Sequence, residues 1–525
     1  MTDLLDSRTA ATPTVRRRSL RPAGWYRDVR ARRFGDAGIA GAFAFLLSVA
    51  FSWVPSVWFD ESATVVSATR SYKQLGAEVQ TVDAVHATYY GLMHGWFDLV
   101  GYTPFTLRFP SAVATGLAAA LVVLLAARLT DKRTGLVAGL VFAVLPRVTW
   151  MGAEGRSYAT ATLLAVALSL VLMHATTRPR PSKRLWVLYG VLALAAGMVF
   201  LYVALVVVAH GLTLALWALR SRLHDRETPW RQALGGWVIA SATAALALIP
   251  LAHLASSQSR QINWILRPGW NVFPNVLGWQ WFMANWQLTA VAWALVVVGV
   301  VSVLRRGARH NAPNVLQVVV PWMAVPTVGL IAVSMVSNPV YSPRYVTFGA
   351  PAVAILIAVG LTALSRRRFI AAGLVVLIAL TAPSYVSQRQ PEAKDNSSWA
   401  EVADLIAHER SLEPSGGDDA IIYGHLRRHA AASARNIAYT YPDAFAGLTD
   451  VTLKKPAAET GKLWEDRFAL ADTIERVDGH EYVWLVTSDK RDIRPAVTQA
   501  LADEGFRVEK QWHLTYVNIV RYQLG

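Results

Sequence analysis

A series of long apolar segments, separated by short polar loops, restricts this chain to few possible folds. Crossing the hydrocarbon core of a bilayer, about 30 Å thick, takes roughly 20 consecutive helical residues. The chain has 525 residues, of which 54% are hydrophobic and only 16% are charged. We therefore predict a polytopic α-helical membrane protein. Its eleven predicted spans are residues 38–57, 106–127, 135–151, 157–175, 186–200, 202–219, 232–254, 287–304, 315–336, 345–364 and 369–386.

Two segments decide the number of spans. The uncharged residues 185–219 would form one helix about 52 Å long at 1.5 Å per residue, which is too long for a single crossing without strong tilt. We therefore predict a hairpin that turns near Phe200–Tyr202. Residues 86–101 are short for a span and contain two histidines and an aspartate. We predict an interfacial or re-entrant helix there; a full crossing would instead give twelve spans.

Basic residues predict the orientation of these spans. A net charge of +16 is also typical of nucleic-acid-binding proteins, but here the lysines and arginines gather in alternate loops. Of those in the tail and the loops up to residue 386, the predicted topology places 26 on one side and eight on the other, as the positive-inside rule requires of cytoplasmic and external loops. We predict a plasma-membrane protein with a basic cytoplasmic tail, residues 1–36, that is disordered or lies on the membrane surface. The transmembrane domain would cover residues 37–386, with an external loop at residues 58–105.

The composition changes after Val386, where polar and apolar residues mix. Helical periodicity marks residues 399–408 and 494–504, whereas residues 420–423, 482–486 and 512–522 have the pattern of strands. We predict an extracytoplasmic α/β domain at residues 387–525 with a structural or acceptor-docking role. The chain has no cysteine, which excludes disulfides, thiolate metal sites and cysteine nucleophiles.

Two adjacent acids, Asp60 and Glu61, follow directly on the first predicted span. An ionisable group at such a position is a candidate for function, and the predicted topology places both acids outside the membrane. Nucleotide-activated donors are absent there, so an activated substrate would have to arrive in the membrane, as polyprenyl-phosphate sugars do. Such a donor needs cations for its phosphate and aromatic walls for its sugar, and the acceptor hydroxyl needs a carboxylate base. The predicted external loops supply such groups in His86, Tyr89, Tyr90, Arg108, Arg156, Tyr158, Trp264, Arg344 and Tyr345.

The order of these motifs resembles a known family. The acidic pair is followed by a segment that begins with a histidine, residues 86–90, by Phe-x-x-Arg-x-Pro-Ser at residues 105–111, by Ala-x-x-Arg-Ser-Tyr-Ala at residues 153–159, and by Pro343-Arg344-Tyr345. The arrangement resembles the polyprenyl-phosphate-dependent membrane glycosyltransferases of the GT-C type. Within that type it is similar to the protein O-mannosyltransferase and aminoarabinose-transferase group, in its actinobacterial form. The histidine segment lacks both prolines of the family pattern His-Pro-Pro-Leu-Tyr-Tyr.

The resemblance implies an inverting glycosyltransferase that moves a sugar from a polyprenyl-phosphate donor to a glycan of the cell envelope. Asp60 would be the general base, and Arg108, Arg156 and Arg344 would bind the donor phosphate. Glu61 would orient the acceptor or, with His86, hold a divalent cation, although two ligands do not define a metal site. The substrate-binding residues would be His86, Tyr89, Tyr90, Tyr158, Trp264 and Tyr345.

Several alternatives remain open from the sequence. Mannose is the preferred sugar and arabinofuranose the alternative, while a protein serine or threonine is the alternative acceptor. The acids also fit an ordinary helix start, the arginines fit contacts with lipid headgroups, and the aromatics fit an interfacial belt. A lipid-linked sugar flippase or transporter is the alternative of a different class. It would predict inverted repeats and charges in the middle of the membrane, neither of which the sequence shows.

Overall fold

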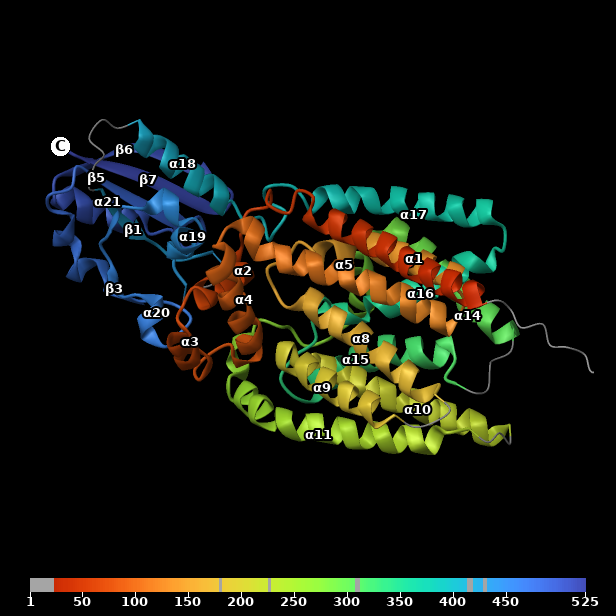
Figure 1. The fold of residues 1–525 in the computed structure, drawn as a ribbon. Coiled ribbons are helices and arrows are strands. Elements are labelled where there is room, and N and C mark those ends of the chain that lie inside the picture. The colour runs from red at the N-terminus through yellow and green to blue at the C-terminus, as the bar shows by residue number, and fades with distance from the viewer. Residues whose placement is uncertain (1–22, 179–181, 225–227, 307–311, 413–418, 428–431) are drawn as a thin grey trace, which may run out of the picture.

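The computed structural model describes residues 23–178, 182–224, 228–306, 312–412, 419–427 and 432–525. It consists of a bundle of long helices and, at one end of that bundle, a smaller domain built on a β-sheet (Figure 1). We call this end of the bundle the domain end. Residues 1–22 of the predicted basic tail lie outside the described residues.

A helix occupies each of the eleven predicted spans. Within the described ranges, eight helices are long and apolar enough to cross a membrane, and this is a membrane-embedded protein. The predicted hairpin is confirmed, because Phe200 adopts an extended conformation between two antiparallel helices. The helices of the bundle are α1 (Ala23–Val49), α5 (Pro104–Leu129), α6 (Lys132–Val144), α7 (Pro146–Met151), α8 (Tyr158–Thr176), α9 (Lys183–Val199), α10 (Ala204–Leu223), α11 (Trp230–Ser257), α14 (Trp286–Arg306), α15 (Val315–Val336), α16 (Ala350–Ala363) and α17 (Arg367–Ser387).

The first helix differs from the prediction at both of its ends. It begins at Ala23, so the second half of the predicted tail is helical, and it ends at Val49 instead of residue 57. The last carbonyl groups of a helix need donors from elsewhere. Arg389 supplies them here, since its guanidinium donates to the carbonyls of Leu47 and Ala50 at 3.0 Å each. This side chain from far along the chain stabilises the early end of α1, which local sequence does not reveal.

Short helices at the domain end replace the predicted external loop. They are α2 (Phe59–Ala68), α3 (Tyr72–Val79), η1 (Ala84–His86) and α4 (Ala87–Val100). Helix α4 has 14 residues, or about 21 Å of helix, and it lies at the end of the bundle beside α2 and not among the long helices (Figure 1). This position agrees with the predicted non-crossing segment. Further short turns are η2 (Leu201–Val203), η3 (Ser259–Ile262), α12 (Val272–Pro274), η4 (Asn275–Trp279), α13 (Gln280–Phe282) and η5 (Pro343–Gly349).

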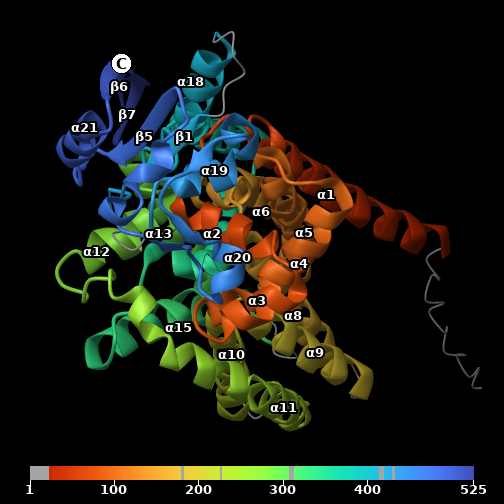
Figure 2. The same cartoon turned by 90° about the vertical axis from the view of Figure 1, so that its left-hand side faces the viewer.

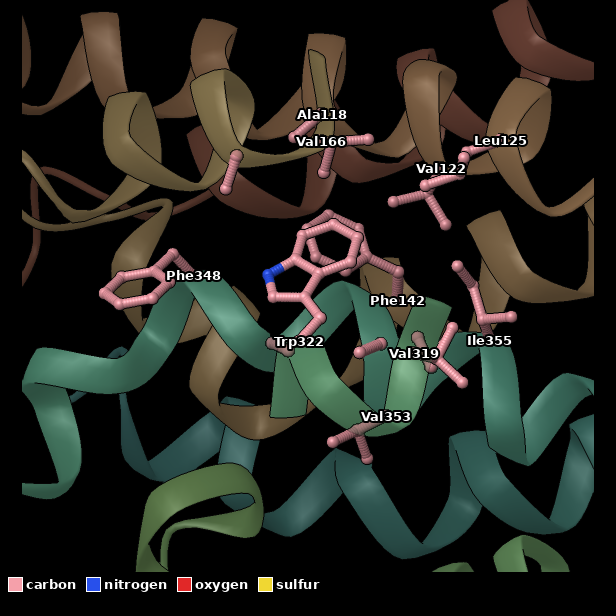
Figure 3. Close-up of a cluster of buried hydrophobic side chains, with 14 of the residues drawn as sticks. Ala118, Val122, Leu125, Phe142, Val166, Val319, Trp322, Phe348, Val353 and Ile355 are labelled. Carbon is pink, nitrogen blue, oxygen red and sulfur yellow. The ribbon is translucent and has the colours of Figure 1, made fainter. Parts of the chain in front are cut away.

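The core of the bundle is a continuous cluster of buried apolar side chains. Trp322 of α15 is fully buried at its centre, between Phe142 of α6 and Phe348 of η5 (Figure 3). Alanine and valine fill much of the remaining space, as Ala118 and Val122 of α5 illustrate. Small side chains of this kind let the helix backbones approach closely, which is how membrane helices gain packing energy.

The C-terminal domain contains a five-stranded mixed sheet in the order β2-β1-β5-β7-β6. Strand β1 runs parallel to β2 and β5, whereas β7 runs antiparallel to β5 and β6. The strands are β1 (Ala420–Tyr423), β2 (Thr449–Asp450), β5 (Tyr482–Ser488), β6 (Phe506–Leu514) and β7 (Val517–Leu524), and a separate hairpin joins β3 (Leu453–Lys455) to β4 (Asp466–Arg467). The predicted α/β domain with its first and central strands is therefore confirmed.

Alternation along the buried strands creates two cores in this domain. Ile421 and Trp484 face α18 (Trp399–Ser411), whereas Ile422 and Leu485 face the side covered by α21 (Arg494–Asp503). Successive strand residues point to opposite faces, so a strand covered on both faces is apolar throughout. The remaining helical elements are α19 (Arg435–Thr440), η6 (Pro442–Phe445), α20 (Ala457–Thr460), η7 (Leu470–Asp472) and η8 (Ile474–Val477).

The C-terminal domain is bonded to the short helices of the bundle. The backbone N–H of Val57 donates to the Tyr441 hydroxyl at 2.9 Å, and the Tyr102 hydroxyl donates to the carbonyl of Thr440 at 2.9 Å. Seen from the domain end, α20 lies next to α2 and α3 (Figure 2). The domain therefore holds a fixed position over the ends of the helices.

Glycine at the crossing of α14 and α16 provides a test of the close packing. A Cβ on Gly360 would lie 2.8 Å from the carbonyl carbon of Leu295 and even nearer to its oxygen, so Gly360→Ala forces the two helices apart. Overpacking of this kind costs about 1–3 kcal/mol. We expect a lower midpoint of thermal unfolding in detergent than for Gly38→Ala in α1, where a Cβ would contact nothing. Equal midpoints would contradict the close approach of α14 and α16.

Candidate active site

A cavity of about 1500 Å³ lies at the domain end, between the helix ends and the C-terminal domain. Its walls include the start of α2, the segment before α4, the ends of α11 and α15, the start of η5, and residues 462–466 of the C-terminal domain. Small-molecule sites usually enclose about 300–1000 Å³, so this cavity has room for two substrates side by side. Of the predicted site residues, it is lined by Asp60, His86, Arg156, Tyr158, Trp264, Arg344 and Tyr345.

Helix geometry separates the two adjacent acids. Successive residues of a helix point about 100° apart, so Asp60 and Glu61 in the first turn of α2 face different surroundings. Asp60 lines the cavity and its side chain is 22% exposed. Its carboxylate accepts a hydrogen bond of 2.6 Å from Nη1 of Arg344. Asp60 is therefore accessible to a substrate and lies beside a cation.

Glu61 lies outside the cavity, in a fully buried cluster of charges. Its carboxylate accepts two hydrogen bonds from Arg108, at 2.8 and 2.6 Å, one from the backbone of Gly155 at 2.8 Å and one from Lys394 at 3.0 Å. Burial alone would raise the pKa of Glu61, but Arg108 and Lys394 lower it to about 2. Glu61 is thus a fixed anion that joins four parts of the chain, and the structure does not support its predicted contact with substrate or with a cation.

Arg108 is the cationic partner in this cluster and it too is absent from the cavity wall. A guanidinium has five N–H donors. In addition to the two bonds to Glu61, Nη1 donates to the carbonyls of Ser52 and Pro55 at 2.7 Å and Nη2 donates to that of Ser56 at 3.3 Å. No donor is left for a phosphate. The prediction that Arg108 binds the donor phosphate is not supported by this geometry, which gives Arg108 a structural role.

Arg156 reaches the cavity from the loop between α7 and α8. Its Nη1 donates to the backbone carbonyl of Asp60 at 3.1 Å, to the hydroxyl of Thr64 at 3.3 Å and to that of Tyr90 at 3.0 Å. Its Nε is buried and has no hydrogen-bond partner among the described residues. The side chain is therefore held beside α2.

Arg344, at the start of η5, lies among aromatic rings. The guanidinium carbon is 4.9 Å from the ring centre of Trp264 and 5.6 Å from those of Trp58 and Tyr345. Contacts of a cation with aromatic faces stabilise it by about 0.5–2 kcal/mol while leaving its N–H donors free. This arrangement combines positive charge and flat apolar surface in the part of the cavity beside Asp60.

Some of the predicted tyrosine and histidine residues line the cavity, and the others lie behind its wall. Tyr158 and His86 line the cavity, whereas Tyr89 and Tyr90 are buried behind its wall. The Tyr90 hydroxyl donates to the carboxylate of Asp83 at 2.7 Å and accepts from Arg156. Tyr90 consequently positions two cavity residues, and the predicted contact of Tyr89 and Tyr90 with substrate is not supported.

Sequence inspection missed two charged residues of this region. Asp83 lines the cavity, and burial raises the pKa of its carboxyl group. Lys394 bridges Glu61 and Glu154, and Glu154 also accepts a hydrogen bond from the Trp58 indole at 2.8 Å. Asp83 lies three residues before the histidine motif, and this short distance could have marked it as a candidate site residue. Lys394 lies in an ordinary polar segment after the last span, where no local pattern marked it.

The described residues contain no group of three or more histidine, aspartate or glutamate side chains that suits a metal ion. Of the two predicted ligands, Glu61 is enclosed by cations while His86 faces the cavity. The pair Glu61 and His86 therefore does not form the predicted cation site.

Comparison with known proteins supports the sequence-based resemblance. Residues 89–249 match the family described as dolichyl-phosphate-mannose-protein mannosyltransferase. ArnT from Cupriavidus metallidurans bound to undecaprenyl phosphate is similar in structure, with a TM-score of 0.53, 14% identity, and coverage of 95% of this chain and 98% of ArnT. The chain has the GT-C fold. The predicted fold class is thereby confirmed, and the family match agrees with the resemblance that the sequence motifs indicate.

Two further solved structures are similar to this chain. The apo state of the same ArnT gives a TM-score of 0.51 at 14% identity, again over 95% and 98% of the two chains. Arabinofuranosyltransferase AftD from Mycobacteria gives 0.47 at 15% identity, over 93% of this chain and 40% of AftD. Among curated proteins, none matches the sequence.

The buried pair of Glu61 and Arg108 predicts a large effect of a single substitution. Arg108→Met leaves the Glu61 carboxylate with only part of its compensation, and breaking a buried pair in this way costs about 3–5 kcal/mol. We expect a strongly lowered unfolding midpoint, partial recovery in the double variant Arg108→Met/Glu61→Gln, and no change in the exposed control Arg367→Met. A variant Arg108→Met that is as stable as the wild type but binds its donor poorly would favour the phosphate-binding role instead.

Proposed function

We propose that the protein is an inverting glycosyltransferase that moves a sugar from a polyprenyl-phosphate donor to a glycan of the cell envelope. The reaction takes place at the domain end, on the extracytoplasmic side of the plasma membrane, with the N-terminus in the cytoplasm. The observation that carries the proposal is the direct contact of Asp60 with Arg344, at 2.6 Å, in the wall of one large cavity. In such a reaction the general base and the phosphate-binding site must lie next to each other, as Asp60 and Arg344 do.

Asp60 acts as the general base. It removes the proton of an acceptor hydroxyl while the hydroxyl oxygen attacks the anomeric carbon of the donor. The new bond forms from the acceptor oxygen to this carbon, and the bond from the carbon to the phosphate oxygen breaks. A single displacement inverts the configuration at the anomeric centre, and the polyprenyl phosphate leaves with its negative charge.

Arg344 and Arg156 bind the phosphate of the donor. Both line the cavity, and the side chain of Arg344 is 19% exposed there. Charge-assisted bonds from guanidinium groups to phosphate are among the strongest polar contacts in proteins. Because charge builds up on the leaving phosphate during the reaction, the same two side chains stabilise the transition state. Trp264, Tyr158 and Tyr345 supply the aromatic surface for the donor sugar.

The apolar side of the cavity suits the lipid part of the donor. Ala252 and Ala255 of α11 and Val333 of α15 line it near the exposed surfaces of these helices. A carrier chain passing between the two helix ends would place its phosphate near Arg344. The similar ArnT structure was solved with undecaprenyl phosphate, a ligand of this class.

Mannose is the proposed sugar, supported by the description of the matching family. Arabinofuranose as the sugar, and a protein serine or threonine as the acceptor, are the alternatives within the same chemistry. A flippase or transporter for lipid-linked sugars is the alternative outside it. The catalytic set Asp60, Arg156 and Arg344 at one end of the bundle favours transfer over transport.

Asp60→Asn tests the general base. Membranes containing the protein are incubated with radiolabelled polyprenyl-phosphate mannose or polyprenyl-phosphate arabinofuranose and a panel of glycan acceptors, and transferred sugar is counted. Loss of a positioned general base lowers the rate by about 10²–10⁴. We expect that loss for Asp60→Asn and normal transfer for Asp98→Asn, whose side chain is 69% exposed on α4. Full activity of Asp60→Asn would refute the assignment.

Arg344→Met tests the phosphate site. Loss of a charged hydrogen bond costs about 1.5–3 kcal/mol, so we expect KM for the donor to rise roughly 10- to 100-fold and kcat to fall. Arg344→Lys keeps the positive charge but loses the planar guanidinium group. Its KM for the donor should therefore lie between those of the wild type and Arg344→Met. Arg267→Met is the matched control, because Arg267 is exposed and does not line the cavity. An unchanged KM for the donor would place the phosphate elsewhere.

A further inference from the structure

One wall of the cavity comes from the C-terminal domain. Residues 462–466, which lead from α20 into β4, line the cavity together with the start of α2. The proposed donor groups, Arg344 with Trp264 and Tyr345, belong to the bundle. The domain therefore contributes to the same cavity as Asp60 without supplying any of the donor groups.

This segment is held in place from both sides. Arg70, which follows α2, donates to the carbonyl of Leu463 at 3.1 Å, and Thr81 donates to that of Gly461 at 2.5 Å. On the domain side, the buried carboxylate of Glu465 accepts from Arg435 and from Ser433, each at 2.6 Å. A segment anchored in this way offers a preorganised surface, which lowers the entropic cost of binding.

Trp464 is the large aromatic side chain of this wall. Part of it packs against the apolar core that α18 covers, and the rest lines the cavity. Its ring centre is 5.3 Å from that of Phe59, the residue that directly precedes the proposed base Asp60. Phe59 and Trp464, whose ring planes are tilted by 46°, thus form an aromatic pair beside Asp60 on the domain side.

Polar groups flank this surface in a way that selects the class of acceptor. Lys462 and Asp466 form an ion pair of 2.9 Å, with side chains 63% and 39% exposed, so both can exchange partners with a ligand. An aromatic face flanked by charged side chains matches a sugar ring, which presents an apolar C–H face and hydroxyl groups at its rim.

We infer that Trp464 and Phe59, with Lys462 and Asp466 at the rim, form the acceptor subsite and that its ligand is the terminal sugar of a glycan. This inference rests on the proposed function. Trp464 is a specificity-determining residue: it stacks on the acceptor sugar and brings one hydroxyl to Asp60, while the donor remains bound by the arginines of the bundle.

The test separates the aromatic face from mere side-chain volume. KM for acceptor and for donor is measured with full-length protein in membranes for Trp464→Leu and Trp464→Phe, using a trisaccharide of the transferred sugar and, in parallel, a threonine-containing peptide. We expect the trisaccharide to be the acceptor. Its KM should rise roughly tenfold in Trp464→Leu and less than about threefold in Trp464→Phe, because only the latter keeps an aromatic face. KM for the donor should not change in either variant.

Trp270→Leu is the control, since Trp270 is 87% exposed and does not line the cavity. Equal KM values for the trisaccharide in the wild type and Trp464→Leu, equal effects of the leucine and phenylalanine variants, or transfer to the peptide alone would overturn the inference. If the wild type transfers sugar from neither donor to any acceptor, the proposed function itself fails. Normal transfer by the wild type with an unaffected Trp464→Leu variant refutes only the acceptor subsite.

Discussion

The structure of the active-site region depends on one buried ionic cluster, formed by Glu61, Arg108, Glu154 and Lys394. Charges removed from water destabilise a fold unless their partners satisfy them, and an isolated buried ion costs several kcal/mol. Here every partner comes from a different part of the chain: α2, α5, the loop before α8, and the segment after α17. These four parts must meet for any one of them to be stable. The cluster thereby fixes the start of α2, and with it the direction in which Asp60 points.

Asp60 and Glu61 are adjacent in one helix turn but have different surroundings. Glu61 points into the protein, where its pKa is lowered to about 2 and it stays ionised and paired. Asp60 lines the cavity, where its partner Arg344 is also partly exposed. The rotation of 100° per residue is sufficient to separate a buried anion from one that faces the cavity. The same division applies to the arginines, since Arg108 uses all its donors internally and Arg156 and Arg344 do not.

The sequence patterns predicted those elements whose stability depends mainly on their own residues. The spans and the strands at residues 420–423 and 482–486 are recognisable in the sequence, because an apolar run fits few structures other than a membrane span or a buried strand. The end of α1 at Val49 was not predictable, since the donors that satisfy its last carbonyls come from Arg389. The site followed the same rule. The motifs singled out Asp60, Arg156 and Arg344, which line the cavity, whereas the internal contacts of Arg108 and Lys394 join segments that are distant in the chain.

The position of Lys394 has a consequence for biosynthesis. It lies 333 residues after Glu61 in the chain, beyond the last helix of the bundle. The ribosome synthesises the chain from its N-terminus. Glu61 and Glu154 therefore lack their shared partner, the ammonium group of Lys394, until the whole bundle has been inserted. The domain end of the bundle is therefore completed last, when the segment that leads into the C-terminal domain docks. An incompletely synthesised chain retains its membrane helices but lacks the cation that completes the cluster beneath Asp60.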